Sequence, residues 1–313
     1  MSSLEIDLPE TFKKNILSCF GNKGTQWLKN LDTMINSCIQ RWNLSECKSV
    51  KDLSFNYVCT AKSADYGDVV LKIAVSGDEI NTEQKALGLY NKTYICTCHD
   101  YYPDLHALLL ERIVPGHNLY SLPRYSQHIS TAAGIITDLP VMVNRPADFP
   151  SYKDWLDKAF VRARKDPEIP KEILDYIHMA GDYFADINNL PMPHMLLHGD
   201  FHHQNILQAG NNRWKVIDPK GVTGVLPLEA GRFIRNQLWV MDRKKHKSVL
   251  QQMVRAFAGA MDVEENIIIQ CAFIDCILSN CWTLEGFLTT KEFNQEITNT
   301  IDEADLFLGS INQ

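Results

Sequence analysis

The chain has 313 residues, of which 45% are hydrophobic and 22% are charged; this composition is that of a folded globular protein and excludes a disordered or collagen-like chain. At this length a core can form without disulfide or metal support. The 38 acidic residues outnumber the 31 basic ones, which gives a net charge of −7 and no cationic excess to neutralise a nucleic acid or an anionic membrane. We therefore expect neither as a partner.

The hydrophobic pattern next predicts an α+β segment. Apolar residues recur at three- and four-residue steps within residues 9–41, which predicts helices. Strands are predicted at 54–60 and 68–75 around a polar turn at 63–67, followed by a helix at 80–91 and strands at 94–98 and 106–112. The sequence Val114-Pro115-Gly116 breaks this pattern, and we place a domain boundary there, between residues 1–113 and 114–313.

The second part of the chain is predicted to be mostly helical, apart from a segment near residues 196–218. The expected helices lie at 122–139, 151–164, 170–188, 246–260, 263–283 and 291–309. We therefore expect a small α+β lobe followed by a larger helical lobe.

Cellular location and thiol chemistry are also constrained. The first residues lack the basic and apolar regions of a secretory signal, and the longest apolar stretches, 135–143 and 267–278, are too short to cross a bilayer. The nine cysteines are odd in number and scattered, as expected for reduced thiols. The sequence Cys96-Thr97-Cys98-His99 has no second pair at zinc spacing, so we expect a strand with incidental thiols. These features predict a cytoplasmic protein.

One polar loop carries the side chains of a phosphoryl-transfer site. His198 and Asp200 follow an apolar run, Asn205 comes five residues after Asp200, and Asp218 follows a second apolar run, thirteen residues after Asn205. In the kinase fold one carboxylate orients a hydroxyl, while an amide and a second carboxylate hold Mg²⁺. The order and spacing of these residues fit that chemistry, whereas the alternative is a surface turn.

This segment resembles the catalytic loop H-G-D-x-x-x-x-N and the downstream Asp of the aminoglycoside phosphotransferase group of kinase-like enzymes. The resemblance implies that Asp200 is the catalytic base, that Asn205 and Asp218 are the Mg²⁺ ligands, and that His198 braces the loop. It further implies ATP and Mg²⁺ as cofactors and an α+β, bilobal protein-kinase-like fold, with an antiparallel sheet plus helices in the small lobe and a large, mostly helical C-terminal lobe.

The first lobe offers the nucleotide-binding residues that this fold needs. Lys72 lies on a predicted apolar strand, and Glu83 follows eleven residues later on a predicted helix, with Glu79 as the less favoured substitute. The backbone of Glu111 to Ile113 looks like the lobe connector that would hydrogen-bond adenine. Residues 1–113 are therefore expected to form a nucleotide-binding lobe, and residues 114–313 to carry the catalytic loop and the acceptor site.

Several further strings resemble one subgroup, the aminoglycoside/hydroxyurea antibiotic resistance kinases, and together they span nearly the whole chain. They are residues 27–28, 41–44, 110–112 with 115–116, 218–221, 232–236 and 281–286, whereas residues 224–229 depart from the usual G-D-P stretch. The resemblance implies transfer of the γ-phosphoryl group of ATP to a hydroxyl of a small molecule, with an aminoglycoside such as streptomycin, or hydroxyurea, as the acceptor.

The sequence gives only candidates for the acceptor site. A cationic acceptor needs carboxylates, and Asp275, Glu285 and Glu292 lie on or beside the C-terminal helices. Asp275 lies in an otherwise apolar stretch, so it is either buried and paired or directed to the acceptor. Trp282 either stacks on the acceptor or belongs to the core.

Other functions fit parts of the same pattern. A kinase for another small metabolite, such as choline or methylthioribose, would share the catalytic loop, because a fold does not fix its acceptor. A metal-dependent hydrolase would use His198, Asp200, His202 and His203 as ligands. The non-enzyme alternative is a silent nucleotide-binding module. The phosphorylated hydroxyl, the preference for ATP over GTP and the oligomeric state, monomer or weak dimer, stay open.

Overall fold

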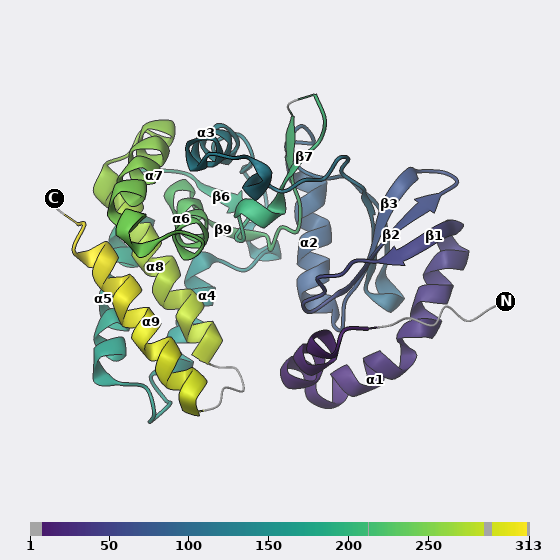
Figure 1. The fold of residues 1–313 in the computed structure, drawn as a ribbon, viewed down its shortest axis with the longest axis horizontal. Coiled ribbons are helices and arrows are strands. Elements are labelled where there is room, and N and C mark those ends of the chain that lie inside the picture. The colour runs from purple at the N-terminus through teal and green to yellow at the C-terminus, as the bar shows by residue number, and fades with distance from the viewer. Residues whose placement is uncertain (1–7, 212, 285–289, 312–313) are drawn as a thin grey trace. The chain divides into compact units, whose positions relative to one another are not determined.

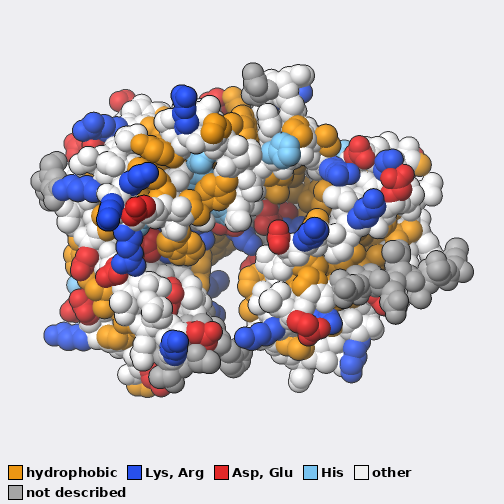
Figure 2. Space-filling model, viewed as in Figure 1, with side chains coloured by type: hydrophobic (Ala, Val, Ile, Leu, Met, Phe, Trp, Pro, Cys, Tyr) orange, Lys and Arg blue, Asp and Glu red, His pale blue; other side chains and the backbone are white. Residues whose placement is uncertain are grey.

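The computed structural model describes residues 8–211, 213–284 and 290–311. The chain divides into two compact units, Met1–Gly116 and His117–Gln313, which we call unit 1 and unit 2 (Figure 1). The boundary lies three residues beyond the predicted one. Acidic and basic side chains are interspersed on the faces drawn in Figure 2.

Unit 1 is built on a five-stranded antiparallel sheet with the strand order β1-β2-β3-β5-β4. Its elements are α1 (Glu10–Trp42), β1 (Leu44–Ser49), β2 (Tyr57–Ser63), β3 (Gly67–Ile73), α2 (Gly77–Leu89), β4 (Cys98–Tyr102) and β5 (Ala107–Glu111).

Successive side chains of β3 point to opposite faces of this sheet. Leu71 and Ile73 are fully buried in a core that they share with apolar residues of α1. Successive side chains of a strand point to opposite faces, so Lys72, between them, points away from α1. It reaches Glu83 of α2, which therefore packs on the other face. The sheet thus presents one buried lysine to a helix.

Unit 2 is mostly helical and contains two small antiparallel ladders, β6 with β9 and β7 with β8. Its elements are α3 (Tyr125–Ile136), α4 (Tyr152–Ala163), α5 (Lys171–Asn188), β6 (His194–Leu197), β7 (Ile206–Gln208), β8 (Trp214–Val216), β9 (Val222–Val225), α6 (Ala230–Trp239), α7 (His246–Met261), α8 (Glu265–Leu284) and α9 (Thr290–Leu308).

Helix α8 forms the centre of unit 2 and contacts α4, α5, α6, α7 and α9. By length and composition it is the one helix among the described residues that could cross a membrane, but 72% of its apolar window is buried within the protein. Its hydrophobicity is therefore that of a core helix. Helix α6 approaches α8 closely at Gly231, where a Cβ atom would lie 2.6 Å from the carbonyl oxygen of Cys271.

The structure departs from the predicted elements in several places. The predicted strand at 94–98 is wrong: β4 begins only at Cys98, and the buried residues Ile95 and Cys96 precede it outside regular strand. Strand β1 was not predicted, because this edge strand buries only Leu44 and shows no alternation. Helix α6 was not predicted either, since it contains two arginines and a glycine. The other predicted elements match the structure to within a few residues.

Candidate active site

In unit 1 the structure brings the two predicted nucleotide-binding side chains together. The Nζ atom of Lys72 donates to Oε2 of Glu83 at 2.6 Å, and both side chains are at most 8% exposed. Strand β3 lies between β2 and β5, which fixes the lysine backbone on both sides. Glu79 is exposed on the same helix. Burial of an ion pair costs solvation energy. The attraction between the two charges offsets this cost only when they lie in close contact, as they do here.

The predicted adenine-binding segment lies at the end of β5. The N–H of Glu111 donates to the carbonyl of Thr97 at 2.8 Å, and the N–H of Arg112 donates to the carbonyl of Asp68 at 3.3 Å. These two donors are thus engaged within unit 1. Ile113 is buried just beyond the strand, and its N–H remains our candidate for an adenine contact.

In unit 2 the His-Gly-Asp loop between β6 and β7 is held by a buried carboxylate. Glu229 accepts hydrogen bonds from the backbone N–H groups of His198, at 2.5 Å, and Gly199, at 2.9 Å. Burial raises the pKa of Glu229 to about 7, against the lowering effect of these two hydrogen bonds. Glu229 ends the 3-10 helix Leu226–Glu229 that leads into α6. One side chain thus ties the loop to α6.

Gly199 is required by the geometry of this loop. Its φ angle is +76°, in the left-handed region that favours glycine. A Cβ atom at this position would lie 2.7 Å from the ring of Trp155 and 2.8 Å from Val222. The tight turn places Asp200 directly after this packed backbone.

His198 is fully buried and makes hydrogen bonds to two backbone groups of this region. Its Nε2 donates to the carbonyl of Ile217 at 2.9 Å, and its Nδ1 accepts from the N–H of Asp200 at 3.2 Å. This pattern assigns the proton to Nε2. Burial lowers the pKa of His198 to about 4, so the ring is neutral at physiological pH.

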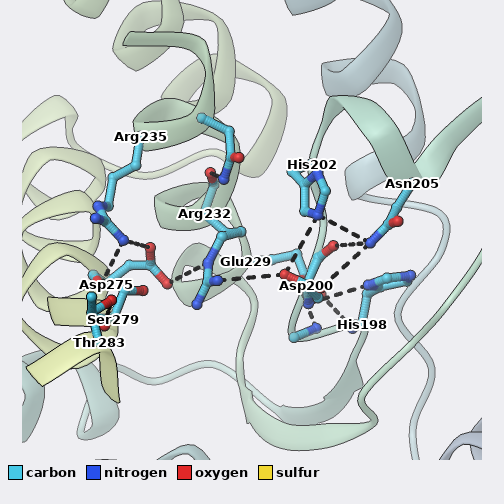
Figure 3. Close-up of polar contacts among 12 residues, drawn as sticks. His198, Asp200, His202, Asn205, Glu229, Arg232, Arg235, Asp275, Ser279 and Thr283 are labelled. Atoms are coloured by element: carbon cyan, nitrogen blue, oxygen red, sulfur yellow. Dashed lines mark hydrogen bonds and ion pairs between the residues drawn. The ribbon is translucent and has the colours of Figure 1, made fainter. Parts of the chain in front are cut away.

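Asp200 lies among basic and amide groups, with its side chain 19% exposed. Its Oδ1 lies 3.7 Å from Nε2 of His202 and 3.5 Å from Nη1 of Arg232 (Figure 3). Burial raises the pKa of Asp200, but the neighbouring His202 ring and the charges of Arg232 and Lys220 outweigh this effect and hold the pKa well below its usual range. Asp200 is therefore an ionised carboxylate that can accept a hydrogen bond from a hydroxyl.

Asn205 and Asp218 are linked through the backbone of one residue. The amide nitrogen of Asn205 donates to the carbonyl of Asp200 at 3.0 Å, and its amide oxygen points away from Asp200 in Figure 3. The N–H of Ile217 donates to the carbonyl of Asn205 at 2.9 Å, while the carbonyl of Ile217 accepts from His198. Asp218 follows immediately, with a left-handed φ of +62°. Such backbone strain in a non-glycine residue is typical of functional sites.

An alternating series of charges extends from Asp200 to the last helix. Arg232 donates from Nε to Asp275 at 3.1 Å, and Asp275 also accepts from Nη1 of Arg235 at 3.3 Å (Figure 3). Arg235 pairs in turn with both carboxylate oxygens of Glu303, at 3.0 and 3.1 Å. Asp275 is therefore buried and paired, which was one of its two predicted states.

The other acceptor candidates differ in position. Trp282 is 36% exposed, and the guanidinium of Arg232 lies 5.8 Å from its ring centroid. Glu292 lies exposed in the first turn of α9. Glu285 lies outside the described residues.

The histidine cluster of the hydrolase alternative does not converge on one point. The ring of His203 is stacked between Tyr120, at 4.4 Å, and Phe233, at 3.9 Å, and its Nε2 bonds to Gln237 at 2.8 Å. Burial lowers the pKa of His203 to about 3, as expected for a core residue. Within residues 8–211, 213–284 and 290–311 no three His, Cys, Asp or Glu residues are arranged to hold a metal ion.

Two residues of the site were missed by sequence reasoning. Glu229 was noted only within the stretch that departs from G-D-P, and Arg232 only as part of a family string. The available signal for Glu229 was its position, because it is an acidic residue that follows apolar residues and precedes a helix. The three-residue spacing of Arg232 and Arg235, which puts both on one helix face, was the available signal for the ion pairs.

A buried ion pair between a lysine of an antiparallel sheet and a glutamate of the adjoining helix, followed by a helical unit with a braced His-Gly-Asp loop, defines a small-molecule kinase of the protein-kinase-like fold. The chain belongs to the aminoglycoside/hydroxyurea antibiotic resistance kinase family, whose model matches residues 41–286. The family and fold predictions are thereby confirmed.

Individual relatives are distant. The chain is 22% identical over 225 residues to a streptomycin 6-kinase of Streptomyces glaucescens, covering 70% of this chain and 71% of that protein. It is 21% identical to the streptomycin 6-kinase of Streptomyces griseus, covering 71% and 73%.

Solved structures share the fold at low sequence identity. An ethanolamine kinase from Plasmodium vivax superposes with a TM-score of 0.64 at 16% identity, covering 96% of this chain and 94% of that one. The aminoglycoside phosphotransferase APH(4)-Ia, in a ternary complex with AMP-PNP and hygromycin B, gives a TM-score of 0.62 at 12% identity, covering 89% and 99%.

Proposed function

We propose that this kinase transfers the γ-phosphoryl group of ATP to a hydroxyl of a small molecule, with Asp200 as the catalytic base. The observation that carries this proposal is the ionised, partly exposed carboxylate of Asp200. The loop that bears it is held by hydrogen bonds from the backbone N–H groups of Gly199, to Glu229, and of Asp200, to His198. Positioning of reactants and neutralisation of charge supply most of the rate in phosphoryl transfer. The rigidity of this loop supports that role.

Asp200 would accept the hydrogen bond of the acceptor hydroxyl and orient its oxygen toward the γ-phosphorus. The bond between this oxygen and phosphorus forms as the bond to the β-phosphate oxygen breaks, and ADP leaves. The low pKa of Asp200 suits an orienting role, because in a loose transition state the proton of the acceptor hydroxyl passes to Asp200 only late. His198 stays neutral and holds the loop.

The donor set fits Mg²⁺. Asn205 offers an amide oxygen and Asp218 a carboxylate, and hard oxygen ligands are those that Mg²⁺ prefers. A bound Mg²⁺ would neutralise charge on the phosphates. The bonds of Ile217 to Asn205 and His198 connect the backbones of the two proposed ligands, so these side chains are carried on one braced structure.

Unit 1 would bind the nucleotide. We propose that Lys72, oriented by Glu83, binds its phosphates and that the backbone at Glu111 and Ile113 contacts adenine. The central place of Lys72 in the sheet and its close pairing with Glu83 support this role. Residues 1–113 would then form the nucleotide-binding lobe, and residues 114–313 the lobe that carries the catalytic loop and the acceptor site.

The acceptor is proposed from the family and from the named relatives. Streptomycin is the substrate named for both relatives, and the family name includes hydroxyurea. We propose a hydroxyl of an aminoglycoside such as streptomycin, or hydroxyurea, as the phosphorylated group, with the enzyme acting in the cytoplasm. Choline or methylthioribose is the alternative acceptor class.

An acceptor screen tests this proposal. ADP release is measured with Mg-ATP and, one at a time, streptomycin, hydroxyurea, hygromycin B, choline and methylthioribose, and the product is weighed by mass spectrometry. The expected result is ADP release dependent on streptomycin or hydroxyurea, with a product heavier by one phosphoryl group. Bound Mg-ATP without turnover of any acceptor would favour the silent binding module, and absent Mg-ATP binding would refute the proposal.

A further inference from the structure

A hollow in unit 1 lies outside the site described above. Its volume of about 450 Å³ is within the range of small-molecule sites. It is lined by residues of α1 and of the segments that follow β3 and precede β5, namely Asn22, Lys23, Gln26, Trp27, Asn30, Met34, Val75 and His106. Helix α1 and the side chain of Lys72 lie on opposite faces of the sheet. The hollow is therefore not part of the proposed nucleotide site.

The wall of this hollow contains a hydrogen-bond donor without an acceptor. Trp27 is only 6% exposed, and its ring packs edge-on against Phe12. Its Nε1 atom is buried and has no hydrogen-bond partner among the described residues. An indole N–H can only donate, and a buried donor that is left unpaired costs folding energy. A ligand that brings an acceptor atom to Nε1 would remove this cost.

The rim beside Trp27 is able to admit such an acceptor. Lys23 and Gln26 line the hollow next to Trp27 in sequence, and both are exposed. Neither side chain makes a hydrogen bond or an ion pair within the part of the chain that the structure describes. Both are long and flexible, so a ligand displaces no existing bond when it moves them away from Nε1.

The electrostatics of this end of the hollow favour an anion. Helix α1 has a non-helical kink at Gly21, with φ of 51° and ψ of −126°, so a new helical segment begins at Asn22. The N-terminal end of a helix carries a partial positive charge, and Lys23 adds a full charge in the same turn. None of the described residues that line the hollow is acidic. A carboxylate therefore meets an attractive charge here, whereas an ammonium group meets a repulsive one.

The other end of the hollow is apolar. Met34 follows Trp27 by seven residues, which is about two helical turns or roughly 10 Å along α1. Met34 and Val75 are both partly buried and pack against the core of unit 1. An apolar group of about this length can cover them and lose its contact with water. The hollow thus combines an unpaired donor and a cation at one end with an apolar surface at the other.

We propose that this hollow binds a small carboxylate with an apolar body. The carboxylate accepts the hydrogen bond of the Trp27 N–H and pairs with Lys23, while the apolar body packs on Met34 and Val75. The inference goes beyond the proposed function and does not depend on it, because none of these residues is assigned to nucleotide binding or to phosphoryl transfer.

Three naphthalene derivatives of similar size test the inference on the full chain. Calorimetry measures the binding of 2-naphthoate, uncharged 2-naphthamide and cationic 2-naphthylmethylammonium. We expect 2-naphthoate to bind about fivefold or more tightly than the amide, and the cation to bind most weakly. Lys23→Gln should reduce the preference for the carboxylate over the amide to about twofold or less, whereas Lys29→Gln, an exposed lysine of α1 outside the hollow, should leave it unchanged.

The indole N–H of Trp27 gives a second, direct measurement. Its NMR signal is identified among those of the six tryptophans by its loss in Trp27→Phe, which keeps an aromatic ring but has no N–H. Addition of 2-naphthoate should move this proton signal downfield, as a new hydrogen bond does, and Trp27→Phe should bind 2-naphthoate about fivefold or more weakly.

Several results would overturn the inference and leave the proposed phosphoryl transfer untouched. They are no binding of 2-naphthoate, equal binding of all three compounds, or an unmoved Trp27 signal when another indole signal moves. Unchanged affinity in folded Lys23→Gln would also overturn it. If Trp27→Phe does not fold, assignment of the indole signals through the backbone of the unmodified protein replaces that variant. Acceptor-dependent ADP release is measured separately, so failure of one proposal is distinguished from failure of the other.

Discussion

The carboxylate of Glu229 accepts a hydrogen bond from the backbone N–H of Gly199 at 2.9 Å, although 30 residues separate the two in sequence. Its second oxygen accepts from His198. Glu229→Gln leaves one acceptor oxygen and places an NH₂ group opposite a backbone N–H. We expect a loss of about 1–3 kcal/mol in unfolding free energy at pH 5 and a clear fall in kcat. Denaturant titration and turnover measure both, with the exposed Glu168→Gln as control. Unchanged stability and turnover would contradict this role.

The same residue predicts a pH dependence of stability. Burial raises the pKa of Glu229 from an ordinary 4.5 to about 7 in the folded state. The folded state therefore holds a proton that the unfolded state releases between these values, so this stabilising contribution is lost as pH rises from about 4.5 to 7, by about 3 kcal/mol. Thermal unfolding from pH 4.5 to 8 should show this slope in the unmodified protein and a shallower one in Glu229→Gln. Parallel pH profiles would exclude the assignment.

Variants of the Lys72–Glu83 pair should distinguish its effect on stability from its effect on nucleotide binding. Lys72→Met leaves a buried carboxylate without this cation and should cost about 3–5 kcal/mol in unfolding free energy. Adding Glu83→Gln removes that charge and should restore much of the stability. Binding of Mg-ATP, measured by calorimetry, should stay weak in both variants and normal in the exposed control Lys85→Met. Recovery of ATP binding in the double variant would show that Lys72 does not hold the phosphates.

Two glycines in unit 2 should respond to alanine in opposite ways. Gly199→Ala forces a left-handed φ on a residue with a Cβ that meets Trp155 and Val222, and should lower the unfolding free energy by about 2 kcal/mol or more and reduce kcat. Gly181→Ala lies within α5 with no atom within 4 Å of the new Cβ, and should stabilise by about 0.5–1 kcal/mol. Chemical denaturation compares them. A neutral Gly199→Ala would mean that this loop is not tightly fixed.

Local sequence patterns pointed to those residues of the candidate site that lie close together along the chain. The order of Lys72 and Glu83, and the spacing of Asp200, Asn205 and Asp218, each occupy a short stretch with a distinctive composition. Glu229 and Arg232 reach the loop only through the packing of α6 against α8. The hydrophobic pattern of a single segment does not show which other helix it packs against. The contacts of Glu229 with His198 and of Arg232 with Asp200 could therefore be found only in the three-dimensional structure.

The fold shows the same division. Long periodic helices such as α5 and α7 were predicted closely because one apolar face repeats along each. Strand β1 buries little and pairs at the edge of the sheet, where it is held by its partner β2 more than by its own side chains. The apolar pair Ile95 and Cys96 resembled a strand, yet these residues fill the core of unit 1 just before β4. Burial and strand pairing are separate properties, and the sequence pattern reports only the first.

The most direct test of the account is the turnover of Asp200→Asn beside the exposed control Asp175→Asn, measured with the acceptor found in the screen. The amide keeps the size of the side chain but cannot accept the hydroxyl proton. We predict that kcat falls roughly 10²- to 10⁴-fold while Mg-ATP binding stays within a few-fold, and that Asp175→Asn behaves as the unmodified enzyme. Turnover of Asp200→Asn within threefold of the unmodified enzyme would contradict the assignment of Asp200 as the catalytic base.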